Sequence, residues 1–182
     1  TTLKLVLKFG GTSLASPKDI TNVAKTITSF SKGNEIVVVC SAVDGVTDDL
    51  ILISTMIEQK KKKEVVKVLD ALIKKHKKLA DQTIKSSVIK KQLLEKLNAD
   101  VSELQELVRG LTLLKEVSAR SLDYLISFGE RLSDDLVSFA LQDIKKKSTA
   151  LNGKEVGIVT DSNFGESRPL MDTTRIRIAK TI

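Results

Sequence analysis

Lysine, glycine and hydroxyl residues follow one another at the end of an apolar segment near the start of the chain. The segment 3–9 is rich in Leu and Val and is typical of a buried strand. The residues at its end that could do chemistry are Lys8, Gly10, Gly11, Thr12 and Ser13. Glycines let backbone N–H groups approach an anion closely, and a helix N-terminus that follows adds partial positive charge. This order favours a phosphate-binding turn, although an ordinary tight turn with a solvated lysine has the same residues.

The spacing of this turn excludes two familiar nucleotide motifs. In a P-loop the lysine follows the glycines and stands directly before Ser or Thr, whereas Lys8 precedes Gly10 and Gly11. The G-x-G-x-x-G pattern of dinucleotide-binding folds is absent here as well. The turn therefore needs support from other parts of the chain.

A second group of polar residues follows the apolar segment 36–40. Ser41 and Thr47 stand on either side of Gly45. A helical pattern at 17–30 lies between the two apolar segments, and together they predict a βαβ unit with parallel strands. Ligands of such sheets collect beyond the carboxyl ends of the strands, so we expect both turns to face one crevice. Capping of the next helix is the alternative role for Ser41 and Thr47.

A carboxylate in a long helix completes the candidate site. The segment 119–144 has apolar residues at helical spacing and contains Gly129 and Glu130. Glycine in a helix interior costs about 1 kcal/mol relative to alanine, so close approach of another backbone or a ligand would account for Gly129. Glu130 has apolar neighbours, and a partly buried carboxylate needs a cation such as Lys8 or a ligand ammonium group. The alternative is a surface glutamate paired with Arg131 or a lysine.

Length and composition fit one globular domain with an aliphatic core. The chain has 182 residues, no Trp and a single cysteine, Cys40, inside an apolar run. An internal disulfide is therefore impossible, and a buried, unreactive thiol in a reducing compartment is expected. Apolar stretches are too short to span a bilayer and no signal peptide is evident, so we expect a cytoplasmic protein without a membrane partner.

The basic charge is concentrated in one segment. The formal net charge is +7, and residues 54–116 hold 15 Lys and Arg against 9 Asp and Glu but no aromatic residue that could stack on bases. Solvated helix faces without a nucleic-acid partner are expected, and a basic anion- or nucleic-acid-binding module is the alternative. His76 is flanked by lysines and is interpreted as a surface residue. With one histidine and one cysteine, no metal site is predicted.

The remaining pattern is helical and then irregular. No Gly or Pro occurs between Gly45 and Gly110, which predicts a lysine-rich helical arm over about 48–117 with breaks near 86–87 and at Asn98. Short strands are predicted at 149–151 and 156–160. The alternation of Arg and Ile at 175–178 predicts a half-buried strand.

Four short runs together resemble the aspartate kinases of the amino-acid kinase superfamily. They are Lys8–Ser13, Ser41-Ala42 with Gly45-Val46-Thr47, Ser127–Ser133 and Thr160–Gly165. The resemblance covers essentially the whole chain. It implies a three-layer α/β/α sandwich around a mostly parallel sheet, here in part, with the helical arm inserted.

The resemblance also implies an activity and a role for each candidate residue. The reaction is ATP-dependent phosphorylation of the side-chain carboxylate of L-aspartate to β-aspartyl phosphate, the first step towards lysine, threonine and methionine, with ATP and Mg²⁺ as co-substrate. Lys8, with Gly10, Gly11, Thr12 and Ser13, would bind the phosphates, and Lys8 would be the catalytic cation. Ser41, Thr47 and Glu130 would hold aspartate.

Other parts of the family pattern are absent from the sequence. The ATP-binding half and the regulatory ACT domains find no match, so residues 1–182 are interpreted as the N-terminal, substrate-binding part of one kinase domain. We expect this part to be inactive alone, to bind no cofactor tightly and to work in a homo-oligomer. A related carboxylate kinase is the alternative within the superfamily.

Overall fold

A parallel pair of strands and the helix between them form the start of the fold. The computed structural model describes residues 2–182. Strand β1 (Lys4–Phe9) pairs with β2 (Glu35–Cys40) in parallel, and Lys8 stands opposite Val39. Helix α1 (Pro17–Phe30) connects them, with Ser16 as its N-cap and Asp19 in its first turn. The predicted βαβ unit is therefore confirmed. The elements around it are η1 (Gly11–Leu14, a 3-10 helix), α2 (Val46–Glu58), α3 (Lys62–Thr83), α4 (Ser87–Leu114), α5 (Ala119–Asp143), α6 (Gly153–Val156) and α7 (Met171–Thr181).

The two faces of the strand pair have different surroundings. Leu7 and Phe9 of β1 and Val38 of β2 pack against the helical core. Because side chains alternate along a strand, Lys8 lies on the other face, where Val6 is 68% exposed. In the described residues, helices thus cover one face of this pair.

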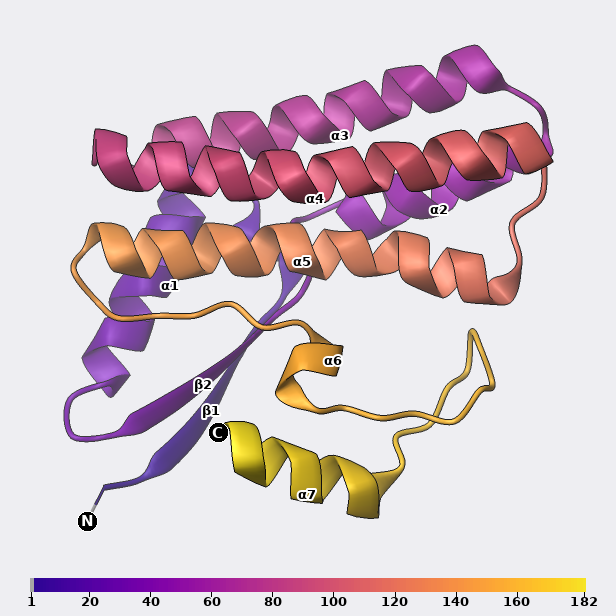
Figure 1. Cartoon of the computed structure of the whole chain (residues 1–182). Helices are drawn as coiled ribbons and strands as arrows, with labels where there is room; N and C mark the ends of the chain where they lie inside the picture. Colours follow the sequence, from indigo (N-terminus) through magenta and orange to yellow (C-terminus); the bar gives the residue numbers. More distant parts are fainter. Residues whose placement is uncertain (1) are drawn as a thin grey trace.

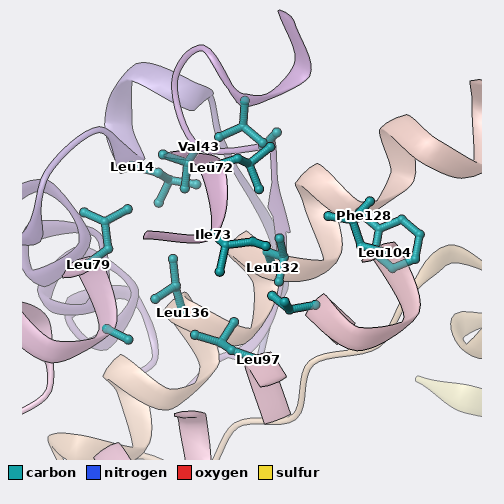
Figure 2. Packing of buried hydrophobic residues seen from close by; sticks show 14 of the residues in the cluster. Leu14, Val43, Leu72, Ile73, Leu79, Leu97, Leu104, Phe128, Leu132 and Leu136 are labelled. Carbon is teal, nitrogen blue, oxygen red and sulfur yellow. The ribbon is translucent and has the colours of Figure 1, made fainter. Parts of the chain in front are cut away.

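Long helices form the layer over the covered face. Helices α3, α4 and α5 lie side by side, with α1 and α2 packed behind them (Figure 1). Their apolar side chains meet in one core, in which Figure 2 shows Leu72 of α3, Leu104 of α4 and Phe128 of α5 together with Val43 of the loop after β2. A break between α3 and α4 lies at 84–86 as predicted, but α4 continues through Asn98 without interruption.

The prediction that His76 is a surface residue is wrong. His76 is 1% exposed, and its Nδ1 lies 2.9 Å from the carbonyl oxygen of Leu72 one turn earlier. The lysines beside it in sequence point elsewhere, because adjacent helical residues do not share a face. Its neighbours at helical spacing are Leu72, Ile73, Leu79 and Ala80, which are all buried.

The predicted strands after residue 148 are also wrong. Residues 149–151 belong to no strand, Gly153 begins α6, and only Thr160 forms a bridge, to Pro169. The segment 175–178 lies within α7. The hydroxyl of the buried Thr174 accepts the N–H of Val159 at 3.0 Å and donates to its carbonyl at 3.1 Å, which docks this helix on the preceding segment.

The architecture agrees with the expected fold class. It is a partial α/β fold with a parallel sheet and a large helical layer. No helix in residues 2–182 is both long and apolar enough to cross a membrane.

Candidate active site

The turn after β1 and the loop after β2 are in close contact. We call residues 41–45 the β2–α2 loop. A Cβ atom added to Gly11 would lie 2.8 Å from the carbonyl oxygen of Ala42 and 3.4 Å from the backbone N and Cα of Asp44. Only glycine permits this approach without displacing backbone. The two turns are therefore neighbours at the carboxyl ends of both strands, as the βαβ pattern predicts.

Helix α5 contributes a carboxylate to the same place. The Oε1 of Glu130 accepts the backbone N–H of Ala42 at 3.3 Å. Ser133, fully buried one turn later, donates its hydroxyl to the carbonyl oxygen of Ser41 at 2.7 Å and to that of Glu130 at 2.9 Å. These bonds fix α5 to the β2–α2 loop and set the position of Glu130.

Gly129 accounts for how closely α5 approaches the loop. A Cβ atom on Gly129 would lie 2.8 Å from the Cβ of Ala42, and 3.6 Å from side-chain atoms of Val46 and Leu50. Close approach is therefore the reason for a glycine in this helix, as its cost in helix propensity predicts. Gly11 and Gly129 thus both lie in close contact with Ala42, one from the β1 turn and the other from α5.

The other candidate side chains surround this contact to different degrees. Ser41 and Thr47 are half-buried, and within residues 2–182 their hydroxyls make no hydrogen bond. Gly45, rather than either hydroxyl residue, is the N-cap of α2, so the capping alternative is wrong. Thr12 is exposed, and the N–H of Ser13 bonds to the carbonyl of Gly10 at 3.0 Å.

Lys8 is not brought into contact with Glu130. Its side chain is exposed and leaves β1 on the face opposite α5, one residue before the strand ends. Across the described part of the chain, Glu130 forms no ion pair, and Arg131 pairs with Asp100 and Glu103 instead. Neither Lys8 nor Arg131 therefore balances the charge of Glu130.

A second acid and a thiol lie beneath the site. Burial, together with the smaller effect of the charge of Glu130, raises the pKa of Asp134, one turn after Glu130, to about 7. Burial and the adjacent Asp134 raise the pKa of Cys40 to about 12, so the thiol stays protonated at neutral pH. The prediction that Cys40 is buried is confirmed. Asp134 stands four residues after Glu130, on the same face of the helix, and this spacing is the sequence signal that could have located it.

An ionic cluster between α4 and α5 holds Arg131, the residue after Glu130 in the run Ser127–Ser133. Arg131 donates to Asp100 at 2.5 Å and to Glu103 at 2.7 Å, and it stacks 4.3 Å from the centre of the Phe128 ring. Asp100 is only 3% exposed and also receives a hydrogen bond from Lys96 at 3.2 Å. This cluster fixes the rotation of α5 beside Glu130.

The fourth motif, residues 160–165, docks on the start of α5. The N–H of Gly165 donates to Asp123 at 2.8 Å, and the Arg120 guanidinium lies 5.5 Å from the centre of the Phe164 ring. Asp161 accepts the N–H groups of Asn163 and Arg168, both at 3.1 Å, which closes the loop. Sequence reasoning found the run but not this docking, because its partners are charged residues of a distant helix.

Two surface hollows lie away from this cluster. One follows the start of α4 and the other lies beside residues 145–149. In residues 2–182 no cluster of His, Cys, Asp and Glu could hold a metal ion. The residues at the strand ends thus provide a carboxylate, two half-buried hydroxyls and the backbone N–H groups of two glycines.

Fold and site together define an α/β protein with a glycine turn and a carboxylate at the ends of parallel strands. A sequence model of the amino acid kinase family matches residues 4–179. The chain belongs to this family.

Curated relatives of the chain are aspartokinases. The chloroplastic aspartokinase 1 of Arabidopsis thaliana is 30% identical over 187 residues, which cover 97% of this chain and 30% of that protein. The aspartokinase of Corynebacterium glutamicum is 26% identical over 179 residues, covering 98% of this chain and 29% of that protein. The chain thus spans about 30% of the length of these relatives.

Solved aspartokinases share the fold. E. coli aspartokinase III in complex with lysine and aspartate matches with a TM-score of 0.84 at 23% identity, over 98% of this chain and 37% of that one. The same enzyme with aspartate and ADP matches with a TM-score of 0.80 at 22% identity, over 100% of this chain and 36% of that one.

Proposed function

We propose that this chain is the aspartate-binding part of an aspartate kinase, which uses Mg-ATP to phosphorylate the side-chain carboxylate of L-aspartate. The observation that carries the proposal is the convergence of Gly11, Ala42, Gly129 and Glu130 at the carboxyl ends of both strands. Aspartokinase relatives along almost the whole chain support it.

Aspartate would bind against α5 and the β2–α2 loop. Glu130 would accept the α-ammonium group of the substrate, because only its Oε1 has a partner within the described residues and that partner is a backbone N–H. The hydroxyls of Ser41 and Thr47 would donate hydrogen bonds to the carboxylate groups of the substrate. A complex of E. coli aspartokinase III with aspartate supports this choice of ligand.

The chemistry asks for charge compensation rather than a base. An oxygen of the substrate β-carboxylate, already ionised, attacks the γ-phosphorus of ATP. A new P–O bond forms, the bond between the γ-phosphorus and the β,γ-bridging oxygen breaks, and ADP leaves with that electron pair. Two anions must be held together, so fixed donors and cations supply most of the catalysis.

Lys8 and the glycine turn would supply that compensation. Lys8 is followed by a single strand residue, so it stands directly before the turn that holds Gly10 and Gly11. No atom lies within 4 Å of a Cβ position on Gly10, which leaves room for phosphate oxygens beside its backbone. Thr12 and Ser13 would add hydroxyl donors on the same turn.

The rest of the nucleotide site would lie outside these residues. The chain spans about 30% of the length of its curated relatives, and a solved neighbour holds ADP. We therefore propose that residues 1–182 are one part of a kinase domain, with residues from about 48 to 117 as its inserted helices. Other parts of the full-length protein would complete the ATP site.

The test is phosphoryl transfer by the full-length protein that contains this sequence. It would be assayed with Mg-ATP against L-aspartate, L-glutamate, N-acetylglutamate and UMP, with the 182-residue chain alone in parallel. We expect turnover of aspartate by the full-length protein and none by the chain alone. Preference for another acceptor would contradict the substrate, and substantial turnover by the chain alone would contradict the division of the site.

A further inference from the structure

One lysine of the basic helix α3 differs from the others around it. Lys74, Lys77 and Lys78 are exposed, whereas Lys75 is half-buried. Its Nζ donates a hydrogen bond to the backbone carbonyl oxygen of Asp44. The same Nζ lies 4.0 Å from the Cβ position of Gly45. Lys75 therefore reaches from the helical layer to the tip of the β2–α2 loop.

The loop tip is held from other directions as well. The backbone of Asp44 lies against Gly11 on the β1 side, and the N–H of Ala42 bonds to Glu130 on the α5 side. The Asp44 side chain is exposed, and the N-cap of α2, Gly45, has no side chain to stabilise the first turn. Within the described residues, Lys75 makes the side-chain hydrogen bond at this tip. A hydrogen bond from a charged donor is also stronger than one between neutral groups.

We propose that Lys75 is a positioning residue of the aspartate site, which acts by holding the β2–α2 loop. This inference rests on the proposed function, because it concerns the loop that would carry Ser41 and lead into Thr47. Loss of the Asp44 contact frees the loop tip, and the substrate must then bear the cost of ordering it. The effect falls on binding of aspartate rather than on the transfer step, since Lys75 itself touches no substrate.

The experiment compares Lys75→Met and Lys75→Arg with the control Lys74→Ala in the full-length protein. We expect Lys75→Met to raise the KM for aspartate about tenfold, the order expected for one lost charge-assisted hydrogen bond, with kcat changed less than about twofold. Arg keeps the charge and the donors, so Lys75→Arg restores KM to within about twofold. Lys74→Ala leaves both constants unchanged. An unchanged KM in Lys75→Met, or an equal effect in Lys74→Ala, overturns the proposal.

Amide hydrogen exchange gives a readout that does not depend on activity. We expect faster exchange at residues 41–47 in Lys75→Met than in wild type or Lys74→Ala, with a melting temperature lowered by no more than about 5 °C in Lys75→Met. Unchanged exchange there overturns the role of Lys75. If the wild-type protein does not phosphorylate aspartate, the proposed function fails, and the exchange result still decides whether Lys75 holds the loop.

Discussion

Gly129 and Gly110 both lie inside helices, but their surroundings are opposite. A Cβ on Gly129 would stand 2.8 Å from that of Ala42, whereas no atom lies within 4 Å of a Cβ on Gly110 in α4. Gly129→Ala should therefore lower the free energy of unfolding by about 1–3 kcal/mol through overpacking, despite the better helix propensity of alanine. Gly110→Ala should raise it by about 0.5–1 kcal/mol. Urea denaturation of both variants checks this, and stabilisation by both would contradict the close approach.

Lys8 has a matched control on the same strand face. Lys4 shares that face and lies 3.6 Å from Glu35, far along the strand from the glycine turn. Lys8→Ala in the full-length protein should lower kcat roughly 10²-fold or more, because charge on the transferring phosphoryl group loses its cation. Lys4→Ala should leave kcat within about twofold. Steady-state kinetics decides, and an effect of Lys8→Ala confined to KM would argue against its role.

His76 makes stability depend on pH. Burial lowers the pKa of His76 below its ordinary 6.5. Between the lowered pKa and 6.5 the unfolded chain binds more protons than the folded chain, so this contribution to the free energy of unfolding falls as the pH falls through that window. The Nε2 of His76 is buried and has no hydrogen-bond partner in the described residues. Protonation of the folded chain would therefore place a charged donor without an acceptor in the core.

The control for this prediction is a variant without the imidazole. Asp134 and Asp135, with pKa values raised to about 7, act in the opposite direction, because the folded chain binds more protons than the unfolded chain as the pH falls from 7. His76→Met keeps both aspartates, so the difference between wild type and variant isolates His76. Denaturation at pH 5 to 8 should show wild type losing stability relative to His76→Met on acidification. A difference independent of pH would contradict a buried neutral His76.

At the scale of elements, the contact between α4 and α5 depends on ions as well as on apolar packing. Asp100 is 3% exposed between Arg131 and Lys96, whereas the Glu103 side chain is 43% exposed. Arg131→Ala should lower the free energy of unfolding by about 3 kcal/mol, because it leaves the buried carboxylate of Asp100 with Lys96 as its one cation. Glu103→Gln should cost less than about 1 kcal/mol. Thermal denaturation tests the order, and equal losses would contradict the dominant role of Asp100.

The sequence predicted those elements whose apolar pattern repeats over several turns. Helix α1, the strands on either side of it and the long α5 follow from hydrophobic spacing. His76 was misjudged from its sequence neighbours, although its spacing from Leu72 and Leu79 placed it on the buried face. The segment 175–178 alternates like a strand, but docking through Thr174 determines its helical state, and no local pattern reports such a contact.

The candidate site was predicted by residue type and only partly by geometry. Gly11, Gly129 and Glu130 meet around Ala42, as turns at strand ends and a costly helical glycine indicated. Lys75 and Asp134 were not found. A lysine in a basic run has no distinctive local signal, and the spacing of Asp134 from Glu130 does not indicate its contact with Cys40. Their roles follow from tertiary contacts with Asp44 and Cys40.

At the scale of the whole molecule, the strand pair has an unequal environment. Val6 is 68% and Val39 45% exposed on the face that carries Lys8, while the other face lies under helices. Apolar side chains exposed together favour contact with further protein. This face is therefore suited to contact with further protein, and the chain spans about 30% of the length of its curated relatives.

The most direct test is a crystal structure of the full-length protein with L-aspartate and a non-hydrolysable ATP analogue. We expect the α-ammonium group of aspartate within hydrogen-bond distance of Glu130. Its β-carboxylate should face the γ-phosphate beside Lys8 and the Gly10-Gly11 turn. Aspartate bound away from the β2–α2 loop, or Glu130 paired with a protein cation in that complex, would contradict the site.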